Sequence, residues 1–179
     1  MRLASVLSVC ALLSLVACAP PAFVAEVKGE TTVPADPTGV SSVLDAFPAV
    51  GSFASLDFNQ NQDFQNQGVT KEQVASAKLK SLQLTVLSPP DQDFSFLDSL
   101  EFYAKAGDQE ERIARKQDIS RLQLSAPNPV LRMEMEGVEL QPFVAAPSMS
   151  IIVRGKGRMP EQEVRLQAIV VLDVGVSLF

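Results

Sequence analysis

The chain has 179 residues, 46% hydrophobic and 20% charged, a composition that supports a buried core and excludes a disordered tail. Its 15 Lys and Arg against 21 Asp and Glu give a net charge of -6, which disfavours nucleic-acid binding because neutralising phosphates requires basic surface. The sequence contains no His, so mechanisms that use an imidazole as base, acid or metal ligand are excluded.

The first 17 residues have the features of a secretory signal peptide. Arg2 supplies a positive charge, and positions 3–17 contain no charged residue. This apolar stretch is shorter than the roughly 20 residues that a membrane-spanning helix needs. We therefore expect residues 1–17 to be cleaved from the mature protein.

The stretch ends in Leu15-Val16-Ala17-Cys18, which resembles the lipobox of bacterial lipoproteins. The resemblance implies that Cys18 receives a diacylglycerol, becomes the first residue of the mature chain and is then acylated on its amine. Two or three acyl chains would anchor the protein stably to a membrane of the bacterial cell envelope, at about 0.8 kcal/mol per buried methylene. Ala19 stands where enteric lipoproteins of the inner membrane carry Asp, which implies the outer membrane.

The mature chain, 18–179, has 14 basic and 21 acidic residues, a net charge of -7. Residues 18–40 are predicted to form a Pro-rich tether, because such segments stay extended and hold a domain clear of a bilayer. Within it, the stretch from Phe23 to Val33 is predicted as an edge strand. The stretch from Ser41 to Phe47 is predicted as a short helix, with Ser41 as its N-cap.

From Ser52 onward the hydrophobic pattern has a period of two, which predicts strands rather than helices. The expected strands cover 53–58, 81–87, 97–105, 130–136, 148–158 and 164–178. Their expected core residues are Leu82, Leu84, Val86, Leu100, Phe102, Ala104, Leu131, Met133, Met135, Met149, Ile151 and Val153, and then Val164, Leu166, Ala168, Val170, Leu172, Val174, Val176 and Leu178.

The last strand is longer than usual, so we expect a bend or bulge in it at Gly175. The residues from Met159 to Gln162 are predicted to form a turn that joins the last two strands as a hairpin. Short helical turns are expected at 70–73 and 139–145.

Short alternating strands separated by Pro, Gly, Asn and Asp predict one all-β domain at 41–179. We expect a single antiparallel β-sandwich, immunoglobulin-like, with one or two short helical turns. A membrane barrel is disfavoured because such barrels are rich in Tyr and Trp at the membrane interfaces, whereas this chain has one Tyr and no Trp.

The segment 57–68 carries Asp or Asn at its first, third, fifth and seventh positions, the ligand spacing of an EF-hand loop. However, Gln62 replaces the Gly of that loop, and Gly68 replaces its bidentate Glu. We interpret the segment as an amide-rich surface loop whose side chains bond to their own backbone. No metal site and no cofactor are predicted.

The sequence offers little support for an enzyme. The carboxylate pairs Glu110-Glu111 and Asp91-x-Asp93 have nothing that brings them together or buries them, as glycosidase chemistry requires. Ser residues lack a Gly-x-Ser-x-Gly elbow, and Lys80 and Ser81 are strand neighbours that face opposite ways.

Arg154, Lys156 and Arg158 alternate, so they share one face of a strand, and the expected hairpin places Arg165 across from them. This basic concentration is interpreted either as a docking patch for an acidic envelope protein, lipid A phosphate or glycan, or as a strand edge guarded by charge. The guarded edge is the preferred interpretation.

The leading functional hypothesis is a lipid-anchored, non-enzymatic binding or structural module of the cell envelope, with the membrane and an envelope protein or glycan as partners. The alternative is a carrier of a small apolar ligand or lipid, held between the sheets or in a partly open barrel. No nucleic-acid partner is expected.

Overall fold

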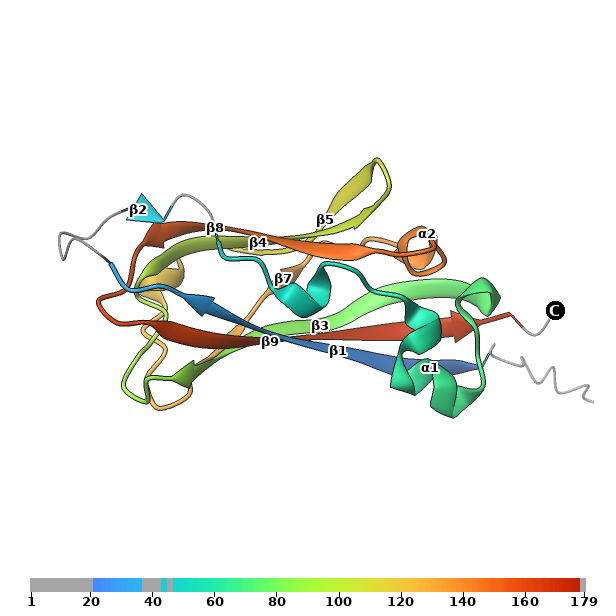
Figure 1. Ribbon diagram of the computed structural model, residues 1–179, viewed down its shortest axis with the longest axis horizontal. Helices are drawn as coiled ribbons and strands as arrows, with labels where there is room; N and C mark the ends of the chain where they lie inside the picture. Colours follow the sequence, from blue (N-terminus) through green and yellow to red (C-terminus); the bar gives the residue numbers. More distant parts are fainter. Residues whose placement is uncertain (1–20, 37–42, 45–46, 178–179) are drawn as a thin grey trace, which may run out of the picture.

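The structure, a computed structural model, describes residues 21–36, 43–44 and 47–177. Within these residues nine strands form two antiparallel sheets that lie face to face (Figure 1). The strands are β1 (Ala22–Val33), β2 (Val43–Leu44), β3 (Val74–Ser88), β4 (Leu97–Ala106), β5 (Gln109–Lys116), β6 (Val130–Arg132), β7 (Glu134–Met135), β8 (Ser150–Arg158) and β9 (Val164–Val176). The helical pieces are η1 (Gly51–Phe53), η2 (Phe58–Gln60), α1 (Gln62–Gln67), η3 (Lys71–Gln73), η4 (Ile119–Arg121) and α2 (Gln141–Val144).

The predicted all-β antiparallel sandwich is confirmed, and the strand order refines it. One sheet has the order β1-β9-β3-β6 and the other the order β2-β8-β4-β5-β7. The first and last strands are therefore neighbours, and the chain crosses repeatedly from one sheet to the other. This is the arrangement of a jelly roll rather than that of an immunoglobulin domain, whose two sheets comprise strands ABED and CFG.

The stretch predicted as a tether contains a full strand of the sandwich. β1 pairs with β9 from Ala22 to Val33 and lies at the sheet edge, as predicted for this segment. Alternate residues of β1, including Ala25 and Val33 at 0% exposure, are buried in the core. The sandwich therefore begins at Ala22 and not at residue 41. Alternate apolar residues make this stretch a strand, and the prolines lie outside it.

The alternation predicted for 81–87, 97–105 and 164–178 is confirmed within the described residues, which end at Ser177 and so exclude Leu178. The predicted inward residues of these three strands are at most 6% exposed. β3 begins earlier than predicted, at Val74, since Val74 and Ala77 are buried as well. β3 and β9 form the centre of their sheet.

The irregularity expected in the last strand lies mainly in its neighbour. The pairing of β3 with β9 shifts register at three places, and each time the extra residue belongs to β3. One of these bulges lies opposite Gly175, where an added Cβ would be 2.5 Å from Ser76 Oγ. The extra residues in the bulges of β3 take up the difference in residue number between the two strands. β9 therefore stays regular as the sheet twists.

The strand predicted at 130–136 is wrong as a single unit. β6 pairs with β3 in one sheet, and β7 pairs with β5 in the other. Leu131 and Met133 are buried as expected, but Met135 is 49% exposed. The chain changes sheets directly after Met133, which an alternating pattern does not reveal.

Two further predictions fail near the start of the domain. Of the helix expected from Ser41 to Phe47, the described residues Val43 and Leu44 form β2, which pairs with β8. The strand expected at 53–58 is replaced by the 3₁₀ turns η1 and η2. Phe53 and Phe58, 0% and 2% exposed, reach the core from these turns. The apolar residues of 53–58 therefore mark buried positions and not the alternation of a strand.

The helical turns at 70–73 and 139–145 are confirmed as η3 and α2. Thr70 N–H donates to Gln73 Oε1 at 2.9 Å, which is half of the expected capping box. In the described part of the chain, no helix has the length and apolar character that crossing a membrane requires.

The predicted C-terminal hairpin is wrong. β8 and β9 are consecutive in sequence but belong to different sheets. The connection at 159–163 therefore carries the chain across the end of the sandwich instead of turning it back within one sheet.

Candidate functional site

The predicted basic face of β8 exists. Arg154, Lys156 and Arg158 are exposed on the outer side of the second sheet, as their alternation predicted. The intervening Gly155 and Gly157 face inward. A Cβ on Gly155 would lie 2.8 Å from Leu100 Cδ2, so glycine there permits close packing while its neighbours project outward.

Arg165, the fourth member of the predicted patch, lies elsewhere. It belongs to β9 in the other sheet, where its Nη2 bonds to Glu30 Oε2 at 2.9 Å. The prediction placed it beside the other three because it assumed a hairpin between the last two strands. The basic face therefore comprises three residues rather than four.

Arg154 is held in place by two neighbours. Its Nη2 bonds to Glu110 Oε1 at 2.6 Å, and its guanidinium carbon lies 4.2 Å from the centre of the Tyr103 ring. The bond to Glu110, followed by the contact with Tyr103, raises the pKa of Arg154 above its usual value. Because Glu110 already neutralises this charge, the Arg154 side chain is held in one position and contributes shape rather than free charge to the site.

Lys156 and Arg158 differ from Arg154. Neither forms an ion pair or side-chain hydrogen bond with any residue of 21–36, 43–44 or 47–177, and the local acidic residues Glu161 and Glu163 do not pair with them. They are therefore available cations on a chain with excess negative charge.

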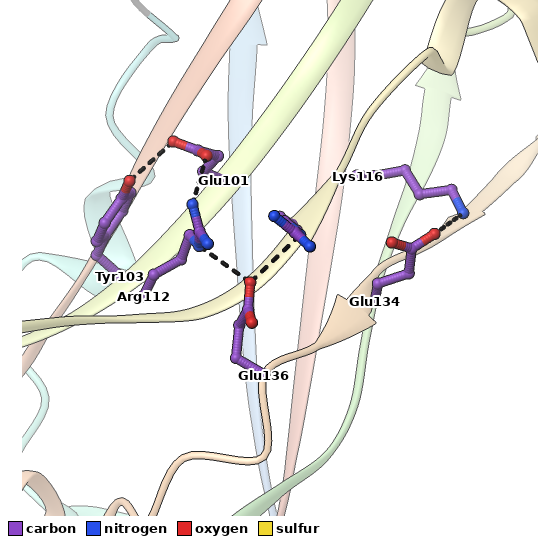
Figure 2. A network of polar contacts seen from close by, with 7 residues as sticks. Glu101, Tyr103, Arg112, Lys116, Glu134 and Glu136 are labelled. Carbon is purple, nitrogen blue, oxygen red and sulfur yellow. Dashed lines mark hydrogen bonds and ion pairs between the residues drawn. The ribbon is translucent and has the colours of Figure 1, made fainter.

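A network of paired charges covers the sheet beside the basic face (Figure 2). Tyr103 donates its hydroxyl hydrogen to Glu101 Oε2 at 2.8 Å, and Arg112 Nη1 donates to Glu101 Oε1 at 3.0 Å. Arg112 Nε also donates to Glu136 Oε1 at 3.0 Å. Lys116 donates to Glu134 Oε1 at 2.7 Å, which forms a separate pair between β5 and β7.

Two of these carboxylates, Glu101 and Glu134, have a pKa below the usual value. The bond from Tyr103, followed by that from Arg112, lowers the pKa of Glu101, and the bond from Lys116 lowers the pKa of Glu134. A catalytic acid needs the opposite shift, towards a raised pKa. Neither Glu101 nor Glu134 therefore has the raised pKa of a general acid.

A cavity of about 510 Å³ lies where the network meets the basic face. The residues that line it include Phe47, Ser99, Glu101, Gln117, Arg154 and Lys156. It thus combines one aromatic side chain, hydroxyl and amide groups, and the available ammonium group of Lys156. This combination can bind an anionic or polar surface group, with Lys156 as the charged contact.

The segment 57–68 is not the loop that was predicted, because it contains η2 and α1, but its side chains bond to backbone as predicted. Asp57 accepts from the N–H of Asn59, and Asn61 Oδ1 accepts from the N–H groups of Asp63 and Phe64 at the start of α1. Asp57 also accepts from Lys71 Nζ at 3.1 Å, which lowers its pKa. The oxygens that suggested a calcium site therefore serve capping and an internal ion pair.

Sequence reasoning missed a second role of this segment, which is to close the free edge of β1. Asp63 Oδ2 accepts from the backbone N–H of Glu26 at 2.7 Å, and Asn61 Nδ2 donates to the carbonyl of Glu26 at 3.2 Å. Ser52 Oγ donates to the carbonyl of Lys28. These side chains take the place of a neighbouring strand, and no short-range sequence signal identifies them.

The remaining candidates are dispersed. Glu110 pairs with Arg154, and Asp91 lines a different cavity at 91–96 and 158–162. Lys80 Nζ bonds to Asp173 Oδ1 at 3.0 Å rather than to Ser81. Cys18, the expected lipid-attachment residue, lies outside the described residues.

No protein-family model and no curated protein matches the chain. Among solved structures, the decameric BFDV capsid protein is similar with a TM-score of 0.43 and 9% identity over 87% of this chain and 98% of that one. Desmodium yellow mottle tymovirus gives a TM-score of 0.29 and 11% identity, over 100% and 94% of the two chains. Cocksfoot mottle virus gives 0.26 and 12%, over 100% and 95%. We draw no conclusion about function from likenesses of this size.

Proposed function

We propose that this protein is a lipid-anchored, non-enzymatic binding module of the bacterial cell envelope. In this proposal Cys18 carries the acyl chains, at the outer membrane rather than the inner one. The sandwich presents the outer face of β8 to an envelope protein with an acidic surface. Lys156 and Arg158 are the charged contacts, and the cavity beside Lys156 receives the partner's side chains.

The observation that carries the binding proposal is that two neighbouring cations on one strand face, Lys156 and Arg158, have no ion pair among the described residues, whereas Arg154 on the same face has one. Among the described residues, Arg112, Arg154 and Arg165 are each paired with a carboxylate. Lys156 and Arg158 are not, although the mature chain has a net charge of -7. Unpaired like charges side by side repel each other, and an acidic partner removes that repulsion while its association is steered by charge.

The alternative of an apolar-ligand carrier has less support. Its ligand would lie between the two sheets, where fully buried side chains such as Phe53, Phe94 and Phe102 form one packed cluster. A carrier would need that space for its ligand. The non-enzymatic part of the proposal is supported by the dispersal of the candidate carboxylates, since Glu110 pairs with Arg154 and Asp91 lines a different cavity.

The test replaces the two available cations and uses the displaced arginine as a control. The double variant Lys156→Gln, Arg158→Gln should keep the melting temperature of the wild type, because exposed side chains of this kind contribute within about 0.5 kcal/mol. It should lose most of the protein crosslinks that the wild type forms in intact envelopes. Arg165→Gln, on the other sheet, should retain them. A double variant that is folded and keeps the wild-type crosslinks would contradict the proposed docking face.

A further inference from the structure

The structure places one corner of the sandwich very close to Cys18 in the chain. β1 starts at Ala22, four peptide units after Cys18, and its first residue pairs with Gly175 near the end of β9. Four residues reach at most about 14 Å even when fully extended. The start of β1 therefore cannot move far from whatever holds Cys18.

A cavity of about 320 Å³ marks this corner. It is lined by the start of β1, the end of β9 and the turn after α1, which lie together at one end of the molecule (Figure 1). We call this group of lining residues the anchor corner: Pro21, Ala22, Phe23, Gly68, Val69 and Val176, together with Gln67, Gln73 and Ser177. None of its residues is charged.

We propose that the anchor corner rests on the phospholipid headgroups of the membrane that holds Cys18. This inference rests on the proposed lipid anchor and adds an orientation to it. The polar headgroup layer is about 5–8 Å thick on each side of a bilayer, so a corner within about 14 Å of the attachment point lies in this layer or a few ångströms above it. A tether of the length first predicted, 18–40, would have left the domain free to turn.

The anchor corner itself presents little charge to a membrane. The segment beside the anchor corner, 61–70, contains one charged residue, Asp63, whose carboxylate accepts a hydrogen bond from the β1 backbone. The opposite end, where β3 leads into β4 and β8 into β9, carries Asp91, Asp93, Glu161 and Glu163 against Arg158. An anionic lipid surface tolerates the uncharged corner itself, while Asp108, Glu110, Glu111 and Glu139 lie at the same end of the sandwich, on the side of the β4–β5 turn.

The orientation also separates the membrane from the proposed docking face. β1 spans twelve residues, or about 40 Å at the rise of a strand. Arg158 and Lys156 lie towards its far end, since Arg158 pairs with Val43 beside the connection to β9. At this height they are well beyond the range of about 8 Å over which charges act at physiological salt. The docking face therefore serves a partner that stands away from the membrane surface and not its lipid phosphates.

Because the chain contains no Trp, the fluorescence of a single introduced Trp reports only on its own position. The chain 18–179, which retains every described residue, is coupled through its single thiol, Cys18, to a maleimide lipid in phosphatidylcholine vesicles. The vesicles contain phosphatidylcholine with a nitroxide on its headgroup, which quenches nearby Trp fluorescence. Single Trp residues are introduced at Gln67, in the anchor corner, and at Gln162, at the far end; both positions are exposed.

We expect the nitroxide lipid to quench Gln67→Trp several-fold more than Gln162→Trp. Asn66→Trp, on the same turn, provides a second reading should Gln67→Trp not fold. A flexible Gly-Ser spacer of about ten residues between Cys18 and Ala19 should keep the protein on the vesicles and remove the difference in quenching. Equal quenching at the two ends without the spacer, or stronger quenching at Gln162→Trp, would overturn the orientation.

Chemical coupling makes this outcome independent of acylation in cells. If the anchor corner is quenched as expected but Cys18 carries no lipid in cells, the orientation holds for a tethered chain and the proposed anchor fails. If Cys18 is acylated in cells and the quenching is equal, the anchor holds and the orientation fails.

Discussion

Gly155 shows how single residues hold the docking face in position. Its missing side chain lets β8 pack against Leu100 and Phe47, while the two flanking cations project outward. The alternation of Arg154, Lys156 and Arg158 was sufficient to predict this register. The ion pair of Arg154 was not predictable, because Glu110 is 44 residues away and reaches it only through the pairing of β8, β4 and β5.

We predict that Gly155→Ala destabilises the protein by about 1–3 kcal/mol, the usual cost of overpacking a core. The new methyl group would lie 2.8 Å from Leu100 Cδ2 and 3.0 Å from Phe47 Cδ2. Gly51→Ala is the matched control, since an added Cβ there meets nothing within 4 Å. Urea unfolding of the three proteins measures the difference. The same midpoint for both variants would show that β8 has room to move away from β4.

At the level of elements, the sequence specified which segments form strands better than it specified their partners. Alternation identifies β4 and β9 because it depends only on the residues of one strand. Pairing depends on sheet membership, and the turn at 159–162 looks the same whether it joins strands within a sheet or between sheets. For the same reason the pattern at 130–136 concealed a change of sheet between β6 and β7.

The edge of β1 gives a prediction at this scale. Asp63→Ala removes the carboxylate that accepts from the N–H of Glu26 and leaves that donor on an exposed strand edge. We expect a loss of about 1 kcal/mol in stability and a stronger tendency to self-associate, because uncovered edges pair with other strands.

Asn66→Ala is the control for this variant, because it lies on the same helix and bonds only to Gln62 within the described residues. Concentration-dependent sedimentation and urea unfolding provide the two measurements. If Asp63→Ala and Asn66→Ala remain equally monomeric and equally stable, the amide-rich segment does not protect the edge.

For the molecule as a whole, the decisive residue is Cys18. We predict that Cys18→Ser abolishes incorporation of radiolabelled palmitate and leaves residues 1–17 attached to the chain. The prediction follows from the lipobox resemblance at 15–18, because a hydroxyl does not replace the thiol that forms the thioether to the lipid. Equal labelling of wild type and variant would show that the acyl chains, if present, are attached elsewhere.

The continuous pairing of β1 with β9 has a mechanical consequence. If Cys18 is held in a membrane and a partner at the far end of the sandwich is pulled away from it, the load runs along the axis of β1. All twelve paired positions between Ala22 and Val33 then resist in shear at the same time, instead of opening one after another. Force applied in this direction meets the strongest geometry that a strand pair offers.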